Sequence, residues 1–291
     1  MKKQILILLA VWAAWVPVGT AQAAMPGTDA ERERFLLEAR VVRMKGAPGG
    51  TTGSYRATLE LDGVQHDAHV QPHDEFRTEM PLASTTELDF RDTWRNNVAA
   101  YRIDRMLGLG MVPVTVARRD PQSRRLASFT WWVDDVLMDE LARYERKLKA
   151  PDTVAWNRQI YIVRIFDQLI YNFDRNLGNL LIDKGWNLWM IDHTRAFKIF
   201  KELRKEKNLP ATCEADLFAR LRTLAKPQLL EATKELLTEG QVDGLLARRD
   251  RILQIYEQRI AELGEGLVLY RLPARRVAAD APTAASAPTA H

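Results

Sequence analysis

The chain has 291 residues, of which 46% are hydrophobic and 27% are charged, a composition typical of globular proteins. This length is sufficient for one two-lobed domain or for two small ones. The formal net charge is +4, and Lys2 and Lys3 contribute two of those charges, so the remainder is too weakly basic to indicate a nucleic-acid partner.

The first 24 residues have the features of a secretory signal peptide. Lys2 and Lys3 precede a mostly apolar run over residues 5–19, and residues 21–23 read Ala-Gln-Ala, the small-x-small pattern of a cleavage site. We expect cleavage and export, with the periplasm as the compartment and no transmembrane span in the mature chain. The alternative is a membrane anchor formed by an uncleaved N-terminal segment, for which the apolar run is short.

Residues 25–34 are polar and predict a linker, whereas residues 35–44 are richer in apolar side chains and suit a strand or a short helix. The next ten residues contain four glycines, among them Gly50 and Gly53. Alternating polarity over 54–61 and 64–70 then predicts two strands that a hairpin turn connects at Asp62-Gly63. A glycine-rich loop between strands can present backbone N–H groups to phosphate, although a flexible loop fits the pattern equally well.

A helix is predicted over residues 92–107, because Gly108 and Gly110 can end it. Strands are expected over 111–117 and 126–133. The second of these contains Trp131 and Trp132, which could line a pocket or pack in the core. Asp134-Asp135 would follow as a hinge into a mainly helical part.

These elements predict an α+β fold with two lobes. The small lobe, over residues 35–133, is rich in strands and has one helix. The second lobe, over residues 134–275, is mainly helical. Residues 276–291 are rich in Ala, Pro and Thr, and we expect them to form a disordered tail.

The second lobe contains the pattern with the clearest chemical meaning. Apolar residues at helical spacing predict a buried helix that stops near 172–174. Two short strands, over 180–182 and 186–191, would then form a hairpin around Lys184-Gly185. Such a hairpin places Asn179 and Asp192 side by side, where both can offer oxygen to Mg²⁺, and Asp174 could reach the same place from the preceding loop.

Asp and Asn residues in loops are mostly turn formers, and that interpretation applies to each of these residues singly. All three at these spacings around a hairpin favour a nucleotide site. In such a site one Asp orients a hydroxyl group, and an Asn with a second Asp holds Mg²⁺ against phosphates.

The pattern also resembles a known family. Asp174-Arg175-Asn176-x-x-Asn179, followed by Ile191-Asp192-His193, is similar to the catalytic loop and metal-binding Asp of atypical kinases. These are the phosphoinositide 3-/4-kinase superfamily, the HipA-type bacterial kinases and the secretory-pathway casein kinases. Their loop typically reads Asp-Arg-His-x-x-Asn, so Asn176 departs from it. Residues 97–113 are similar to the small-lobe helix and following strand of bacterial proteins of this kind, and the resemblance covers roughly residues 35 to 260.

The resemblance implies an exported bacterial member of this superfamily, with ATP and Mg²⁺ as cofactors. Asp174 would be the catalytic base, and Arg175 would be a second residue of the catalytic loop. Either Arg175 or Arg195 would brace this loop by pairing with a carboxylate. Asn179 and Asp192 would be the metal ligands. Gly50 and Gly53 remain candidates for nucleotide binding.

The same resemblance puts Gln71 and Asn97 where typical kinases have a strand Lys and a helix Glu, so both are candidate cofactor-binding residues. The two amides can hydrogen-bond each other, which indicates coordinated replacement of an ion pair. Gln cannot neutralise phosphate. Either another cation does so, with Arg56, Arg77 and Lys45 as candidates, or phosphate binds weakly, or the protein is a pseudokinase.

Three functions follow as hypotheses. The first is phosphoryl transfer to an unidentified acceptor, which could be a protein, a lipid or a small molecule. The second is a pseudokinase or interaction module that binds nucleotide without transfer, and the third is AMP transfer on the same fold. The basic run over 198–207 could receive phosphate or an acidic substrate, or it could be the solvated face of a helix.

Overall fold

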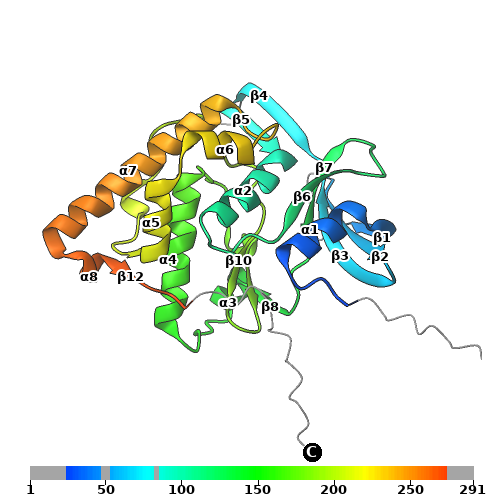
Figure 1. Cartoon of the computed structure of the whole chain (residues 1–291), viewed down its shortest axis with the longest axis horizontal. Coiled ribbons are helices and arrows are strands. Elements are labelled where there is room, and N and C mark those ends of the chain that lie inside the picture. Colours follow the sequence, from blue (N-terminus) through cyan, green and yellow to red (C-terminus); the bar gives the residue numbers. More distant parts are fainter. Residues whose placement is uncertain (1–23, 47–52, 82–84, 274–291) are drawn as a thin grey trace, which may run out of the picture.

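The computed structural model describes residues 24–46, 53–81 and 85–273. The first half of these residues forms mainly strands and the second half mainly helices, and the two parts lie side by side (Figure 1). The predicted α+β class, with a small β-rich lobe and a mainly helical lobe, is therefore confirmed. The predicted signal peptide, the tail over 276–291 and Gly50 lie outside the described residues, apart from Ala24.

The small lobe is built on a five-stranded antiparallel sheet of order β1-β2-β3-β7-β6. The predicted turn at Asp62-Gly63 joins β2 to β3, and both turn residues have positive φ, 52° and 80°. That geometry matches the right-handed twist of the two strands. The strands are β1 (Arg40–Gly46), β2 (Tyr55–Leu61), β3 (Val64–Gln71), β6 (Thr115–Arg119) and β7 (Leu126–Trp131).

A helix, α1 (Asp29–Glu38), replaces most of the predicted linker over 25–34 and adds a helix to the one expected in this lobe. Thr28 caps it: the Thr28 hydroxyl accepts from the Glu31 N–H at 3.2 Å, and the Glu31 carboxylate accepts from the Thr28 N–H at 2.9 Å. Only Phe35 and Leu36 are buried, and they pack on the sheet side. With so few apolar positions the helical period is absent, although the Thr-x-x-Glu capping box was present in the sequence.

An antiparallel hairpin of β4 (Asp74–Pro81) and β5 (Thr86–Thr93) precedes the long helix of this lobe, α2 (Trp94–Met106). The sequence analysis did not predict this hairpin, because β4 is mostly exposed and the apolar residues of the two strands do not alternate regularly. In Figure 1 it reaches past α2 toward the helices of the second lobe. The buried Asp104 of α2 accepts from the N–H groups of Met111 (3.0 Å) and Val112 (3.1 Å), which fixes the chain that follows.

The second lobe begins with a small sheet of order β10-β9-β8, and its β9–β10 hairpin confirms the two strands predicted around Lys184-Gly185. The long helix α4 (Thr153–Leu169) contacts β10 of this sheet. The strands are β8 (Val136–Asp139), β9 (Leu180–Asp183), β10 (Leu188–Met190), β11 (Cys213–Glu214) and β12 (Leu269–Tyr270). The helices are α3 (Glu140–Glu145), α4 (Thr153–Leu169), α5 (Ala215–Thr223), α6 (Lys226–Ala232), α7 (Glu239–Leu263) and α8 (Glu265–Val268), with the 3-10 turns η1 (Leu177–Asn179) and η2 (Glu206–Asn208).

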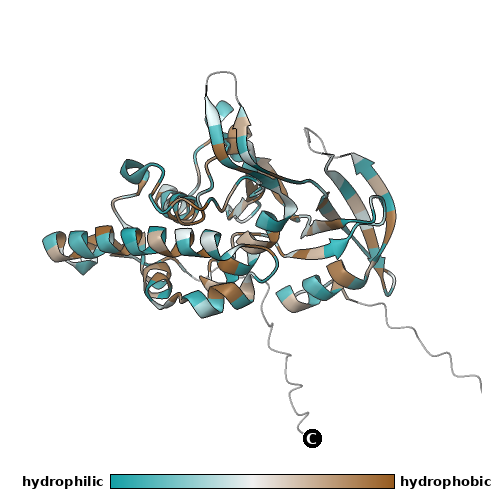
Figure 2. Cartoon of the chain, turned by 90° about the horizontal axis from the view of Figure 1, so that it is seen from above, coloured by the Kyte–Doolittle hydropathy of each residue, from teal (hydrophilic) through white to brown (hydrophobic). Residues whose placement is uncertain are grey.

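Apolar and polar residues alternate around α7, the longest helix (Figure 2). Its buried side, which includes Val242, Leu245 and Ile252, contributes to the core together with α4. Among the described residues, each helix is either too short or too polar to cross a bilayer. The basic run over 198–207 does not form the helix face that the sequence allowed; it is irregular apart from η2, and Lys198 is buried.

Candidate active site

The loop after α4 is fixed by its own polar side chains. Helix α4 ends at Leu169, and the Asn172 N–H returns to the Asp167 carbonyl at 2.8 Å. Asn176 then caps η1, since its side-chain oxygen accepts from the Asn179 N–H at 3.2 Å. The residue that departs from the kinase pattern therefore orients the turn that carries Asn179.

Arg175 braces this loop from behind. Its guanidinium binds the Asp167 carboxylate at 3.0 and 3.1 Å and the carbonyls of Asn179 (3.2 Å) and Ile191 (2.6 Å). It is absent from the described lining of the adjacent cavity. The bracing that the sequence suggested is thus an observed contact, and the Arg175 guanidinium holds this loop against Asp167 and the β9–β10 backbone.

The predicted pair of metal ligands lies at the open end of the β9–β10 hairpin. The Ile191 N–H donates to the Asn179 carbonyl at 3.1 Å, which joins the two strands immediately before Asp192. Asp192 has a φ of 56°, in the left-handed region, and its Oδ1 accepts from the Thr194 hydroxyl at 3.1 Å. Asn179 and Asp192 are brought together as the sequence predicted.

A cavity of about 470 Å³ lies between the two lobes. Asp174, Asn179 and Asp192 line it from the second lobe, and Gln71 and Asn97 line it from the small lobe. Gly53 has a φ of 72° but is not among the described lining residues. The cavity is also lined by Ser54, His69, Asp92, Val112, Pro113, Thr115, Thr130, Trp131, Trp132, Val133, Leu181, Met190, Ile191, His193, Thr194 and Arg195.

Asn97 links the two lobes at the cavity floor. Its Oδ1 accepts from the His193 N–H at 2.8 Å, and its Nδ2 donates to the Ser128 hydroxyl at 3.3 Å. Gln71 accepts from the His73 N–H at 3.0 Å through its Oε1. Both amides are buried and reach the cavity as predicted for the strand and helix positions. Asn97 thereby fixes the residue that follows Asp192.

The cavity is acidic at its centre. Burial raises the pKa of Asp174 above its ordinary value, and the charges of Asp192, Asp92 and Glu87 act in the same direction against the opposing effect of Arg195. Burial lowers the pKa of His69, which Asp192 only partly offsets, so the His69 ring is neutral near pH 7. Carboxylates that repel one another in this way favour binding of a cation between them.

Asp92 is a site residue that the sequence analysis missed. It lies on β5, and its Oδ1 is buried in the cavity wall with no partner among the described residues. The sequence predicted the helix to begin there, so nothing marked Asp92 as facing the cavity. A buried oxygen without a donor is a suitable cation ligand, because leaving it unpaired costs about 1–3 kcal/mol.

Oxygen donors of this kind fit Mg²⁺ or a similar hard cation. Asn179, Asp192 and Asp92 offer amide and carboxylate oxygens. Within the described ranges, no set of three or more His, Cys, Asp or Glu side chains is arranged to hold a metal by itself. A sparse oxygen set is usual for Mg²⁺, which keeps several waters and takes further ligands from substrate phosphates.

The cations proposed to replace the missing Lys do not reach the cavity. Arg56 donates to Asp67 at 2.7 Å and stacks over Trp132, with 4.1 Å from its guanidinium carbon to the ring centroid. Arg77 pairs with Glu75 at 2.6 Å, and Lys45 is exposed on β1. Arg195 is the one Lys or Arg among the described lining residues, and the sequence analysis gave it only a bracing role.

Comparison with known proteins supports the fold assignment. No protein-family model and no curated relative matches the chain. The structure of hydra Fam20 with sugar is 15% identical, with a TM-score of 0.64, and the match covers 90% of this chain and 96% of that one. The Golgi casein kinase with Mn and ADP bound is also 15% identical, with a TM-score of 0.60 and coverage of 84% and 80%. The chain therefore shares the kinase-like fold of these two structures.

Proposed function

We propose that this protein is an atypical kinase that transfers a phosphoryl group from ATP to an acceptor hydroxyl with the help of Mg²⁺. One observation carries the proposal: Asp174, Asn179 and Asp192, from separate segments of the second lobe, line a single cavity with Gln71 and Asn97 of the small lobe. The Golgi casein kinase, which has this fold, was solved with Mn and ADP, in support of a metal–nucleotide ligand.

Asp174 is the proposed general base. In the transfer, the acceptor oxygen bonds to the terminal phosphorus, the bond from phosphorus to the bridging oxygen breaks, and ADP leaves. The acceptor proton passes to the Asp174 carboxylate, whose raised pKa makes it a better proton acceptor than an ordinary Asp.

Asn179, Asp192 and Asp92 would hold the divalent cation, which neutralises charge on the phosphates when bound. The neutral amides of Gln71 and Asn97 would donate to nucleotide oxygens without adding charge. Trp132 and Val133 line the same cavity and offer apolar surface for a nucleotide base.

A second candidate function is nucleotide binding without transfer. Gln71 favours it, because an uncharged side chain stands where typical kinases have the phosphate-binding Lys. This candidate predicts saturable nucleotide binding with negligible release of ADP.

The test measures ATP turnover by the purified protein in the presence of Mg²⁺, followed as ADP release. Intact mass spectrometry of the protein and of added acceptors identifies the product. We expect Asp174→Asn to slow turnover by at least about 100-fold, the scale of a lost general base. Asp216→Asn is the matched control, since Asp216 is exposed and pairs with Arg271 on the surface. ADP release by Asp174→Asn at the wild-type rate would contradict the assignment, and a product heavier by AMP would indicate nucleotidyl transfer.

We also propose export to the periplasm with removal of residues 1–24. The charged start, the apolar run and the Ala-Gln-Ala pattern support this. The periplasmic fraction of an export-competent bacterial host should contain a chain that begins at Met25, as determined by N-terminal sequencing. A full-length chain that retains Met1 in the membrane fraction would instead indicate an uncleaved anchor.

A further inference from the structure

Arg195 lines the cavity and is held there by several contacts. Its Nη2 binds Glu87 Oε2 at 2.6 Å, and its guanidinium carbon lies 4.5 Å from the Phe90 ring centroid and 5.0 Å from that of Phe173. Phe173 immediately precedes Asp174. The Arg195 Nε is buried without a partner in the described part of the chain. The side chain is therefore held in place while one donor remains available.

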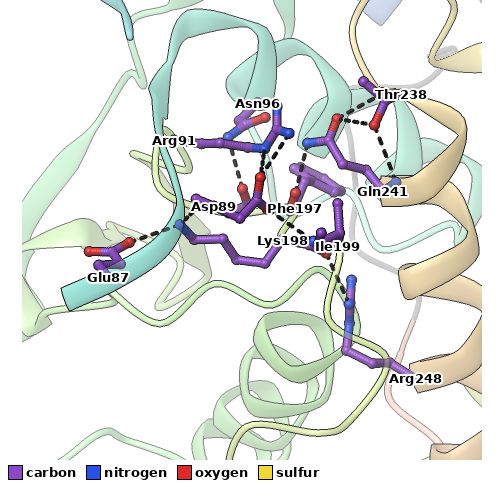
Figure 3. A network of polar contacts seen from close by, with 11 residues as sticks. Glu87, Asp89, Arg91, Asn96, Phe197, Lys198, Ile199, Thr238, Gln241 and Arg248 are labelled. Carbon is purple, nitrogen blue, oxygen red and sulfur yellow. Dashed lines mark hydrogen bonds and ion pairs between the residues drawn. The ribbon is translucent and has the colours of Figure 1, made fainter. Parts of the chain in front are cut away.

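Arg195 shares the carboxylate of Glu87 with a second cation. Glu87 also binds the Lys198 amine at 2.8 Å, a contact drawn in Figure 3. One carboxylate therefore pairs with both Arg195 and Lys198. The nearby Asp89 pairs with Arg91 at 2.9 Å and adds no free negative charge. Lys198 is only 1% exposed and cannot reach a ligand. Of these two cations, Arg195 is therefore the one that lines the cavity.

A phosphate-bearing ligand needs such a charge. Gln71 supplies none at the small-lobe wall, and the nearby Asp92, Asp174 and Asp192 repel phosphate unless cations intervene. A guanidinium can donate more than one hydrogen bond to phosphate oxygens, which suits it to this role.

We propose that Arg195 binds the terminal phosphate of the nucleotide and contacts the non-bridging oxygens of the phosphoryl group during transfer. This inference rests on the proposed function. Glu87 is the positioning residue, because it fixes one edge of the guanidinium through Nη2 and leaves Nε as a donor without a partner among the described residues. Arg195 thereby replaces, from the second lobe, the charge that a strand Lys supplies in typical kinases.

The experiment compares affinities for ADP and for a non-hydrolysable ATP analogue, with Mg²⁺, by calorimetry. We expect Arg195→Gln to lower the affinity for the ATP analogue by at least about tenfold, the scale of a hydrogen bond to a charged group. The affinity for ADP should change by less than about twofold. Glu87→Gln should show a smaller loss in the same direction. Arg204→Gln is the matched control: Arg204 also stacks on Phe173, at 4.9 Å, but is not among the described lining residues.

An unchanged ratio of analogue to ADP affinity in Arg195→Gln would overturn the role of Arg195 while leaving nucleotide binding intact. If Arg195→Gln also loses ADP binding, the comparison passes to Glu87→Gln, which keeps Arg195 but removes the carboxylate that fixes its guanidinium. A fall in the analogue-to-ADP ratio there supports the proposal, and an unchanged ratio overturns it. Failure of the wild type to bind either nucleotide would refute the proposed function itself.

Discussion

The two walls of the cavity are built in different ways. The small-lobe wall is a regular sheet, in which β3 and β7 satisfy each other's backbone groups through a ladder. The opposite wall follows Asp192 as an irregular chain over 193–200. Buried side chains bind its carbonyls: Asn96 binds those of Thr194 (2.8 Å) and Ala196 (2.9 Å), and Gln241 binds that of Phe197 (2.7 Å) (Figure 3).

The walls also differ in charge. His69 and Gln71 of β3 give the sheet neutral groups, whereas the charged Asp174 and Arg195 lie on the irregular side and Asp92 comes from the separate β4–β5 hairpin. The charged groups Asp174 and Arg195 therefore lie on the side of the cavity that has no sheet to support its backbone. A sheet keeps its geometry when a charged side chain is replaced by an amide, while an irregular wall depends on distant side chains that hold it.

Removal of one such support should have a large effect on stability. Arg248 of α7 is buried and donates to the carbonyls of Leu169 (2.8 Å), Lys198 (3.2 Å) and Phe200. Burial lowers its pKa to about 10, so it remains charged at pH 7. We expect Arg248→Met to lower the free energy of unfolding by about 2–4 kcal/mol, because several buried carbonyls lose their donor.

Chemical denaturation measures this change. Arg251→Met provides the comparison, since Arg251 lies on the same helix but is exposed and pairs with Glu206. Equal and small losses in both variants would mean that the irregular wall does not need its buried anchor.

The sheet of the small lobe should tolerate a new positive charge at Gln71, and that charge should strengthen the binding of ATP. Gln71→Lys introduces the cation of typical kinases on a rigid strand, and we expect affinity for ATP with Mg²⁺ to rise by about tenfold. Gln65→Lys is the control, because Gln65 is exposed at the other end of β3. Calorimetry should show a gain only for Gln71→Lys. An equal affinity in both variants would mean that phosphate does not approach this wall.

The smallest effect concerns Asp174 in the absence of metal. Its pKa is raised in the folded protein, so the folded state holds the proton more tightly than the unfolded chain does. That contribution to stability is present at low pH and is lost as pH rises through the folded pKa. Asp174→Asn should therefore be more stable than the wild type at pH 7 by a few tenths of a kcal/mol, since partial exposure screens the charge.

Thermal unfolding at two pH values tests this sign. The advantage of Asp174→Asn should shrink as pH falls below about 4, where the carboxyl is protonated in both states. Added Mg²⁺ should also reduce it, because a cation relieves the same repulsion. A variant less stable than the wild type at pH 7 would show that the Asp174 carboxylate stabilises the fold.

The sequence predicted those parts whose signals are local. The β2–β3 and β9–β10 hairpins follow from alternation and turn residues, and the spacing of Asp174, Asn179 and Asp192 around a hairpin was enough to bring them into one cavity. These contacts join residues close together in the chain, so short-range patterns determine them.

The remaining features depend on distant contacts. Strand β4 is mostly exposed and the β4–β5 hairpin has no regular apolar alternation. Asp92 lines the cavity only because this hairpin lies where it does. Arg195 gains its position from Glu87, which is 108 residues earlier. Arg175 was predicted among the catalytic residues, but the bonds that direct it away from the cavity go to Asp167 and to backbone carbonyls. Such pairings leave no periodic trace in a single sequence.

The most direct test of the account is calorimetric titration of the purified protein with ATP, with and without Mg²⁺, beside Asp192→Ala and the control Asp216→Asn. The account predicts saturable binding that requires Mg²⁺ in the wild type and in Asp216→Asn, and its loss in Asp192→Ala, because Asp192 is a proposed ligand of the cation. Binding of equal strength in Asp192→Ala, or no binding by the folded wild type, would contradict the assignment of this cavity as a metal–nucleotide site.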